Sequence, residues 1–213
     1  MTIAIIDYGM GNLRSVHKAF EKIGCPATIV STPRAVRDAD ALVLPGVGAF
    51  QKCFENLDRQ GLIEPLCTSV RQGKPFLGIC LGMQLLFSTS QEFGTSPGLD
   101  IVRGTVVRFQ FPNLERSERP VKIPHMGWNS IHIHAPHPCL EDIPDGSWFY
   151  FVHSYYVVPE DKAVVATTTN YAGCEFVSSI AADNIFACQF HPEKSQTIGL
   201  RLLKNFAHCA SCW

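Results

Sequence analysis

Short apolar runs alternate with segments of helical periodicity along much of the chain. Leu13–Ile23 places Val16, Phe20 and Ile23 on one stripe at helical spacing, and Gly24 follows as a stop signal. Apolar runs separated by helices are typical of a parallel sheet that is covered on both faces. Five runs are therefore predicted strands of such a sheet: Thr2–Ile6, Ala27–Val30, Ala41–Leu44, Pro75–Ile79 and Asn184–Cys188.

The pattern changes from about Asp100 to Ile180, where Val, Ile, Thr, aromatic residues and prolines are frequent. This composition predicts short antiparallel strands: Ile101–Phe109, Trp128–His132, Trp148–Val152, Ala163–Thr169 and Glu175–Ala181. Phe111–Pro120 is a predicted surface loop, and Ser195–Ala207 is a predicted final helix. We predict a single domain over residues 1–213, with an α/β fold. Its mostly parallel, doubly wound sheet carries helices on both faces and an antiparallel β extension.

The segment from Lys74 to Phe87 contains a candidate nucleophile. Cys80 follows the apolar run Pro75–Ile79, and Gly78 and Gly82 lie two residues away on either side. Glycines at this spacing permit a sharp turn from strand to helix, which exposes the residue between them. We expect a helix from Leu81 to about Ser90, whose N-terminal N–H groups point at the sulfur and favour the thiolate.

Two further segments supply the groups that a thiolate needs. His191 and Glu193 follow the run Asn184–Cys188 and can act as base and orienting carboxylate, on the same side of an extended segment. The loop Pro45-Gly46-Val47-Gly48 follows another predicted strand and can turn backbone N–H groups toward an oxyanion. Both segments and Cys80 come at the C-terminal ends of predicted strands, where parallel sheets carry their sites.

Charge and cysteine content exclude several classes of function. The 18 basic and 19 acidic residues give a formal net charge of −1, so no basic face indicates nucleic acid. The longest apolar segment, which contains Cys80, is too short to cross a membrane, so we expect no membrane partner. Nine cysteines without framework spacing indicate reduced thiols, as in a cytoplasm. Cys209 and Cys212 have redox-motif spacing, but we interpret them as part of a frayed tail.

Two other readings of local segments are weaker. His132 to Cys139 contains three histidines and a cysteine, which are zinc ligands, but the alternation at His132 and His134 is also that of a half-exposed strand. The loop Asp7–Asn12 has two glycines without the spacing of a dinucleotide or P-loop motif. We therefore expect no metal and no cofactor.

Taken together, the Cys80 turn, the distant His191 and Glu193, and the glycine-rich loop resemble the class I, triad-type glutamine amidotransferases. This family implies a flavodoxin-like fold and hydrolysis of glutamine to glutamate and ammonia through a cysteine thioester. Three strings resemble more closely the glutaminase subunits of imidazole glycerol phosphate synthase: Pro124 to Asn129, Phe151 to Tyr155, and Phe190 to Ser195.

The resemblance implies a role for individual side chains. Cys80, His191 and Glu193 would form the triad, and N–H groups of Val47, Gly48 and Leu81 would bind the oxyanion. Glutamine would be held by four residues: Gln84, Glu92, Ser154 and Tyr155.

The resemblance also implies a partner, a (β/α)8-barrel cyclase subunit that forms a heterodimer with the chain. The cyclase uses the ammonia in histidine biosynthesis to make imidazole glycerol phosphate and an aminoimidazole carboxamide ribotide. Candidates for the interface are Asn12, Trp128, Tyr155 and Lys194. Two alternatives stay open: a glutaminase that serves anthranilate or pyridoxal phosphate synthesis, and a non-catalytic protein of the same fold with Cys80 as redox sensor.

Overall fold

Five parallel strands form the centre of the molecule. The computed structural model describes residues 1–111 and 121–212. The parallel strands lie in the order β2-β1-β3-β4-β14. Their bounds are β1 Ile3–Ile6, β2 Ala27–Val30, β3 Ala41–Gly46, β4 Phe76–Cys80 and β14 Ile185–Cys188. All five predicted strands are confirmed, and four of them are buried along their whole length because helices cover both faces of the sheet.

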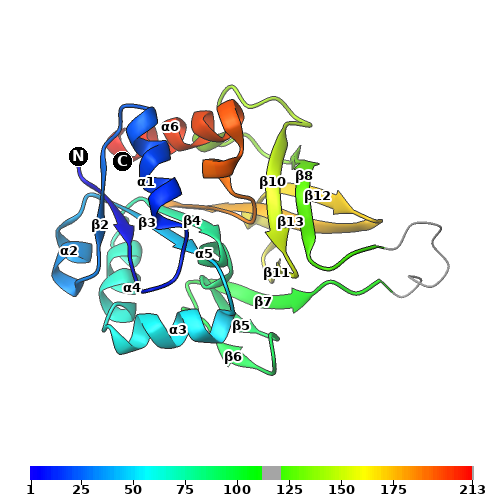
Figure 1. The fold of residues 1–213 in the computed structure, drawn as a ribbon, viewed down its shortest axis with the longest axis horizontal. Helices are drawn as coiled ribbons and strands as arrows, with labels where there is room; N and C mark the ends of the chain where they lie inside the picture. Colours follow the sequence, from blue (N-terminus) through cyan, green and yellow to red (C-terminus); the bar gives the residue numbers. More distant parts are fainter. Residues whose placement is uncertain (112–120, 213) are drawn as a thin grey trace.

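Helices lie on both sides of this sheet (Figure 1). The helices α1 Leu13–Lys22 and α6 Gln196–Cys212 pack on one face, where Phe20 and Phe206 meet Ile5 and Ile79. On the other face lie α2 Pro33–Asp38, α3 Phe50–Arg59 and α4 Ile63–Arg71. One apolar cluster therefore lies between each face of the sheet and the helices that cover it. The predicted doubly wound architecture is confirmed.

The second half of the chain extends the same sheet with mostly antiparallel strands. The order continues from β14 as β13-β11-β7-β5-β6, and β12 pairs with β13 and β9. Their bounds are β5 Phe87–Ser90, β6 Ser96–Pro97, β7 Val102–Arg108, β9 His132–Ile133, β11 Tyr155–Pro159, β12 Val165–Tyr171 and β13 Cys174–Ala182. The 3-10 helices are η2 Pro138–Leu140, η3 Lys162–Val164 and η4 Pro192–Lys194.

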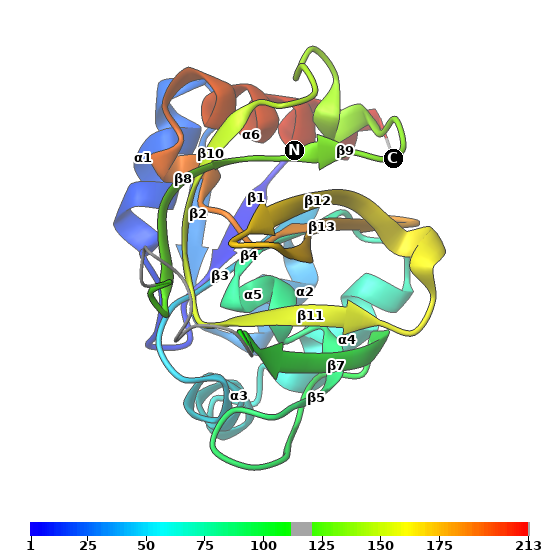
Figure 2. The ribbon, with the colours of Figure 1, turned by 90° about the vertical axis from the view of Figure 1, so that its right-hand side faces the viewer.

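A separate two-stranded sheet stands beside this extension. The strands β8 His125–Ser130 and β10 Trp148–His153 pair antiparallel, with Tyr150 opposite Trp128. Figure 2 shows the two strands side by side, running along the edge of the molecule between α6 and β11. This sheet faces the C-terminal ends of β4 and β14, because Cys80 contacts the backbone of β10.

The helix predicted from Leu81 to about Ser90 is wrong beyond its first turn. The helix α5 contains only Leu81–Gln84, and the chain then turns into β5. The backbone carbonyls of Leu85 and Leu86 accept hydrogen bonds from the segment that begins β7, at Leu99, Ile101 and Val102. These bonds to another segment replace the next helical turn, so tertiary pairing overrides the helical spacing of the leucines.

Several smaller predictions also need correction. No strand was predicted at Tyr155–Pro159, which is β11, and β8 begins at His125 instead of Trp128. The helix α6 continues to Cys212, so the segment from Cys209 is its last turn and not a frayed tail. Most of the predicted loop Phe111–Pro120 lies outside the described residues. In the part of the chain that the structure describes, no helix is long and apolar enough to span a membrane.

Candidate active site

Cys80 occupies the turn from β4 into α5. Its backbone has φ +56° and ψ −110°, a conformation that L-residues rarely adopt, and strain of this kind gathers at functional sites. A Cβ at Gly82 would overlap the backbone carbonyl oxygen of Leu44 on β3. The residue two positions after Cys80 therefore must be glycine for α5 to pack against the sheet, which explains half of the motif in steric terms.

His191 and Glu193 reach the same place from β14, which runs parallel to β4 with Cys188 beside Ile79. Nδ1 of His191 lies 2.9 Å from Oε1 of Glu193, and both side chains are buried. The predicted contact is confirmed, but Glu193 lies in the 3-10 helix η4 and not in an extended segment. The backbone of His191 is fixed as well, since its N–H donates to the carbonyl of Tyr150.

Charge at the site keeps a proton on His191. Burial lowers its pKa, but the negative charge of Cys80 and the hydrogen-bonded Glu193 outweigh burial and raise the pKa to about 10. Geometrically, Nε2 of His191 is buried without a well-formed hydrogen bond among the described residues. The pair Nδ1–Glu193 leaves Nε2 as the nitrogen that can exchange a proton with a bound molecule.

Cys80 and His191 line one cavity of about 270 Å³ at the C-terminal edge of the sheet. The predicted oxyanion residues and the predicted glutamine-binding residues also line it. Its walls consist of Val47, Gly48, Cys80, Leu81, Gln84, Glu92, Pro124, Val152, His153, Ser154, Tyr155 and His191. Glu193 supports His191 from behind, outside this lining.

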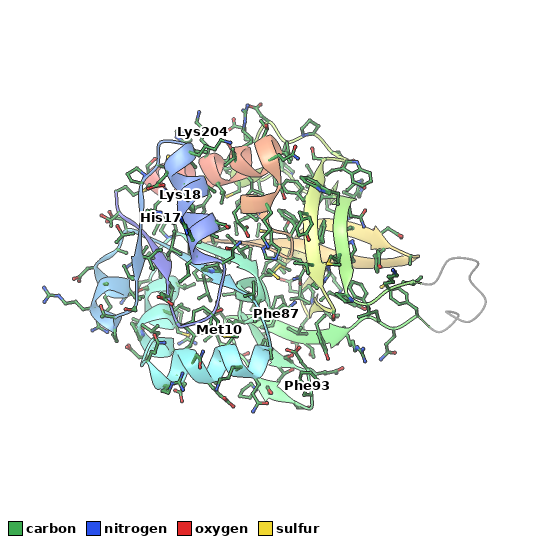
Figure 3. All side chains as sticks on the ribbon, viewed as in Figure 1. Met10, His17, Lys18, Phe87, Phe93 and Lys204 are labelled. Atoms are coloured by element: carbon green, nitrogen blue, oxygen red, sulfur yellow. The ribbon has the colours of Figure 1, made fainter. Side chains whose placement is uncertain are left out.

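The loop that contains Val47 and Gly48 is anchored from below. The hydroxyl of Tyr8 donates to the carbonyl of Pro45 at 3.0 Å, and the thiol of Cys53 lies 3.7 Å from the carbonyl of Val47. Gly48 has φ +99°, and a Cβ there would lie 2.6 Å from Cε of Met10. Met10 belongs to the loop between β1 and α1, as Figure 3 shows. Glycine at position 48 thus permits both the backbone turn and the approach of this second loop.

Two of the predicted glutamine-binding residues already have protein partners. Oε2 of Glu92 accepts a hydrogen bond of 2.5 Å from the N–H of Phe50, the first residue of α3. Nε2 of Gln84 donates both to the carbonyl of Tyr155 at 3.0 Å and to Oε1 of Gln189 at 2.9 Å. An amide nitrogen has two hydrogens, so Gln84 has its Oε1 left to accept from a ligand in the cavity.

The structure brings together two of the predicted interface residues. Nζ of Lys194 lies 5.7 Å from the ring centroid of Tyr150, and Trp128 contacts the same ring edge-on at 6.3 Å. Trp128 is 42% exposed. Asn12 is the residue before α1, and its side chain does not cap that helix.

Four polar residues near the site were missed by the sequence reasoning. His125, Asn129 and His153 lie inside the strings that carried the family resemblance, and Gln189 directly precedes the third string, but no local pattern distinguishes the four from structural residues. Their contacts involve partners up to 109 positions away along the chain, so only the fold reveals them. One signal in the sequence could have found Gln189: it is a polar residue between the apolar residues Cys188 and Phe190.

The histidines of the weaker zinc reading are engaged elsewhere. Nδ1 of His132 lies 3.0 Å from Oδ2 of Asp145, and Nε2 of His134 lies 2.8 Å from the hydroxyl of Thr168. Within residues 1–111 and 121–212, no three or more His, Cys, Asp or Glu side chains are grouped to hold a metal ion.

Comparison with known proteins places this geometry among related chains. The family model "Glutamine amidotransferase class-I" matches residues 4–209. The chain is 56% identical over 204 residues to imidazole glycerol phosphate synthase subunit HisH of Syntrophotalea carbinolica, covering 96% of this chain and 98% of the relative. It is 53% identical over 206 residues to the same subunit of Geobacter metallireducens, covering 97% of each.

A solved glutamine amidotransferase superposes with a TM-score of 0.72 at 18% identity, covering 98% of each chain. At that identity the likeness supports the fold alone.

Proposed function

The chain belongs to the class-I glutamine amidotransferases and, among them, to the imidazole glycerol phosphate synthase subunits HisH, and from this membership we propose how its cavity works. The chain is the glutaminase subunit of that synthase and hydrolyses glutamine to glutamate and ammonia for histidine biosynthesis. The two alternatives, a glutaminase of another pathway and an idle redox sensor, are not favoured.

In the first half of the proposed reaction, the sulfur of Cys80 attacks the side-chain amide carbon of glutamine. A C–S bond forms, and the amide oxygen takes up negative charge. His191 then gives its proton to the amide nitrogen, the C–N bond breaks, and ammonia leaves a glutamyl thioester. The raised pKa of His191, about 10, supports this role because the imidazole carries that proton at neutral pH.

In the second half, His191 accepts a proton from water as the water attacks the thioester carbon. Collapse of the second tetrahedral intermediate breaks the C–S bond and releases glutamate, and the proton on His191 restores the starting state. Glu193 holds Nδ1 of His191 at 2.9 Å throughout, which keeps Nε2 directed at the reacting atoms.

Backbone donors support stabilisation of the oxyanion. Leu81 is the first residue of α5, so its N–H has no partner within that helix. The loop at Val47 and Gly48 faces it across the cavity lining. We assign the oxyanion to N–H groups of these three residues, and the substrate's polar groups to Gln84, Glu92, Ser154 and Tyr155, which line the same cavity.

The membership implies a cyclase partner that takes up the ammonia. We propose that this partner is a (β/α)8 barrel and that the two subunits form a heterodimer in the cytoplasm. Ammonia passes between them in its neutral form, because ammonium has no lone pair with which to attack. The exposed face of β8 and β10 supports an interface there: Met126, Trp128 and Trp148 are 67%, 42% and 58% exposed. Large exposed apolar side chains in one area are typical of partner surfaces.

The observation that carries the proposal is the arrival of Cys80 and His191 in one cavity from adjacent parallel strands. It is tested by measuring glutamate formation by the purified chain, alone and with the cyclase and its nucleotide ligand. We expect weak activity alone, strong activity in the complex, and none with Cys80→Ala.

Two outcomes would contradict the proposal. High activity alone that the cyclase leaves unchanged would keep the glutaminase but exclude the heterodimer. Glutamate formation that survives in Cys80→Ala would exclude the thioester route.

A further inference from the structure

We propose that Gln189 is a further catalytic residue, whose side-chain N–H holds the sulfur of Cys80 and is aimed by a chain of hydrogen bonds that begins at Asn129. This inference rests on the proposed glutaminase function. Neither the glycine-flanked turn at Cys80 nor the His191–Glu193 pair requires a carboxamide at position 189. Gln189 would therefore be a fourth side chain that takes part in the reaction, beside the triad.

Gln189 touches the reacting sulfur from the protein side. Its Nε2 lies 3.5 Å from Sγ of Cys80, and its side chain is fully buried. It follows β14 and precedes His191 by two residues, and its backbone N–H donates to the carbonyl of Ser178 at 2.8 Å. Gln189 is absent from the cavity lining, so it can act on the sulfur without occupying space that glutamine needs.

The orientation of the Gln189 amide is fixed by its neighbours. Its Oε1 accepts from Nε2 of Gln84 at 2.9 Å, and the same nitrogen donates to the carbonyl of Tyr155 at 3.0 Å. Reversing Gln84 would place its Oε1 against the carbonyl oxygen of Tyr155, and reversing Gln189 would place its NH2 group against the NH2 group of Gln84. Because Gln84 cannot reverse, Gln189 must present its N–H group, and not its oxygen, to Cys80.

The carbonyl of Tyr155 is in turn held by a pair of buried histidines. Nδ1 of His153 lies 2.9 Å from that carbonyl, and Nε2 of His153 lies 2.9 Å from Nδ1 of His125. Nε2 of His125 is 3.2 Å from the side-chain nitrogen of Asn129, which also donates to the carbonyl of Asn170 at 2.9 Å. Every donor in this chain meets an acceptor only if both rings are neutral and carry their hydrogen on Nδ1.

Burial keeps the two rings in that neutral state. It lowers the pKa of His125 to about 4 and that of His153 to about 3. The rings of Phe109, Phe151 and Phe176 pack around the pair and exclude water. The direction of each hydrogen bond from Asn129 to Cys80 is therefore set by the fold at neutral pH.

A neutral N–H donor at the sulfur favours the chemistry at two points. It stabilises negative charge on Sγ before the C–S bond forms, and again when that bond breaks and the sulfur departs from the second intermediate. Bonds to charged groups are the stronger ones, so loss of this donor should lower kcat about ten- to a hundredfold. The Michaelis constant for glutamine should stay unchanged, because Gln189 makes no contact with the cavity.

The test is Gln189→Met in the complex with the cyclase, with kcat and KM for glutamine measured separately. Methionine has a similar length and no N–H group. The control is Thr167→Val, which also removes a fully buried polar group, a hydroxyl that is hydrogen-bonded to the hydroxyls of Ser178 and Ser179. We expect the drop in kcat in Gln189→Met alone, together with a slower alkylation of Cys80 by a glutamine-mimicking diazoketone.

A second pair of variants tests the chain at a distance from the sulfur. His125→Asn keeps a donor at the position of Nδ1, and His125→Leu removes it. We expect the leucine variant to lose kcat by several fold and the asparagine variant to retain most of it. This comparison also decides the matter if Gln189→Met does not fold.

The proposal is overturned if Gln189→Met keeps the kcat of the wild type, or if both His125 variants are equally active. Failure of the proposed glutaminase function would give a different result. In that case the wild-type complex forms no glutamate, or the Cys80→Ala complex forms glutamate as well as the wild type does.

Discussion

At the scale of single residues, His125 and His153 couple stability to pH. Their pKa values are lowered by burial to about 4 and about 3, against about 6.5 in an unfolded chain. Below pH 6.5 the two histidines bind protons in the unfolded chain but stay neutral in the folded one. The free energy of unfolding therefore falls as the pH drops from 6.5 to the folded-state pKa values of about 4 and about 3. Each histidine contributes a slope of up to about 1.4 kcal/mol per pH unit.

Urea unfolding at pH 7 and at pH 4.5 measures this loss. His125→Asn removes one of the two buried bases, so its stability should fall less between these pH values than that of the wild type. The groups around the pair are the rings of Phe109, Phe151, Tyr171 and Phe176, with His191 close to His153. Equal losses in wild type and variant would show that other groups control the acid transition.

The sequence identifies residues whose role depends on local spacing and misses residues whose role depends on distance in space. Cys80 is recognisable because Gly78 and Gly82 fix its turn, and His191 because Glu193 is two positions away. Nε2 of Gln189 lies 3.5 Å from the sulfur, but its partners Gln84 and Cys80 lie more than 100 positions away. Such contacts follow only from the pairing of β14 with β4.

At the scale of elements, the turn from β4 into α5 depends on a bare backbone at Gly82. We predict that Gly82→Ala lowers the free energy of unfolding by about 3 kcal/mol or more, because the methyl group would overlap the backbone of Leu44. Gly24→Ala is the control: its Cβ meets nothing within 4 Å, and only its φ of +74° is unfavourable, costing about 1 kcal/mol. Urea denaturation midpoints compare the two, and similar losses would show that steric overlap at Gly82 is relieved by small shifts.

Periodicity predicts the parallel strands well and the segment after the nucleophile poorly. A strand buried on both faces is a continuous apolar run, and each of the five such runs is a strand. Leu81, Leu85 and Leu86 also fit a helix, yet α5 ends at Gln84 because β5 gains partners in β6 and β7. Sγ of Cys80 therefore lies at the start of a single helical turn, whose dipole is small compared with that of a long helix.

At the scale of the whole molecule, the exposed face of β8 and β10 is the surface that we assign to the cyclase. We predict that Trp128→Ala weakens the complex about tenfold or more, as expected for an aromatic anchor at an interface. Titrating the cyclase against glutaminase activity measures the dissociation constant. Ile29→Ala is the matched control, since Ile29 is 41% exposed and lies on β2, an edge strand of the other sheet.

Equal affinities of the two variants for the cyclase would show that the interface lies on another surface. Another exposed aromatic side chain, Phe93, lies in the turn between β5 and β6 (Figure 3). It would then be the next position to replace, because its neighbour Glu92 lines the cavity.

The place of β14 has a consequence for how the protein is made. This strand lies between β4 and β13 in the finished sheet but is synthesised after both of them. At synthesis rates of about 5 to 20 residues per second, Cys80 is synthesised roughly 5 to 20 s before His191. During that interval the nascent chain has a nucleophile without its base, and two strand edges without their neighbour. The pair of Cys80 and His191 can therefore form only after β14 has been synthesised and has paired with β4.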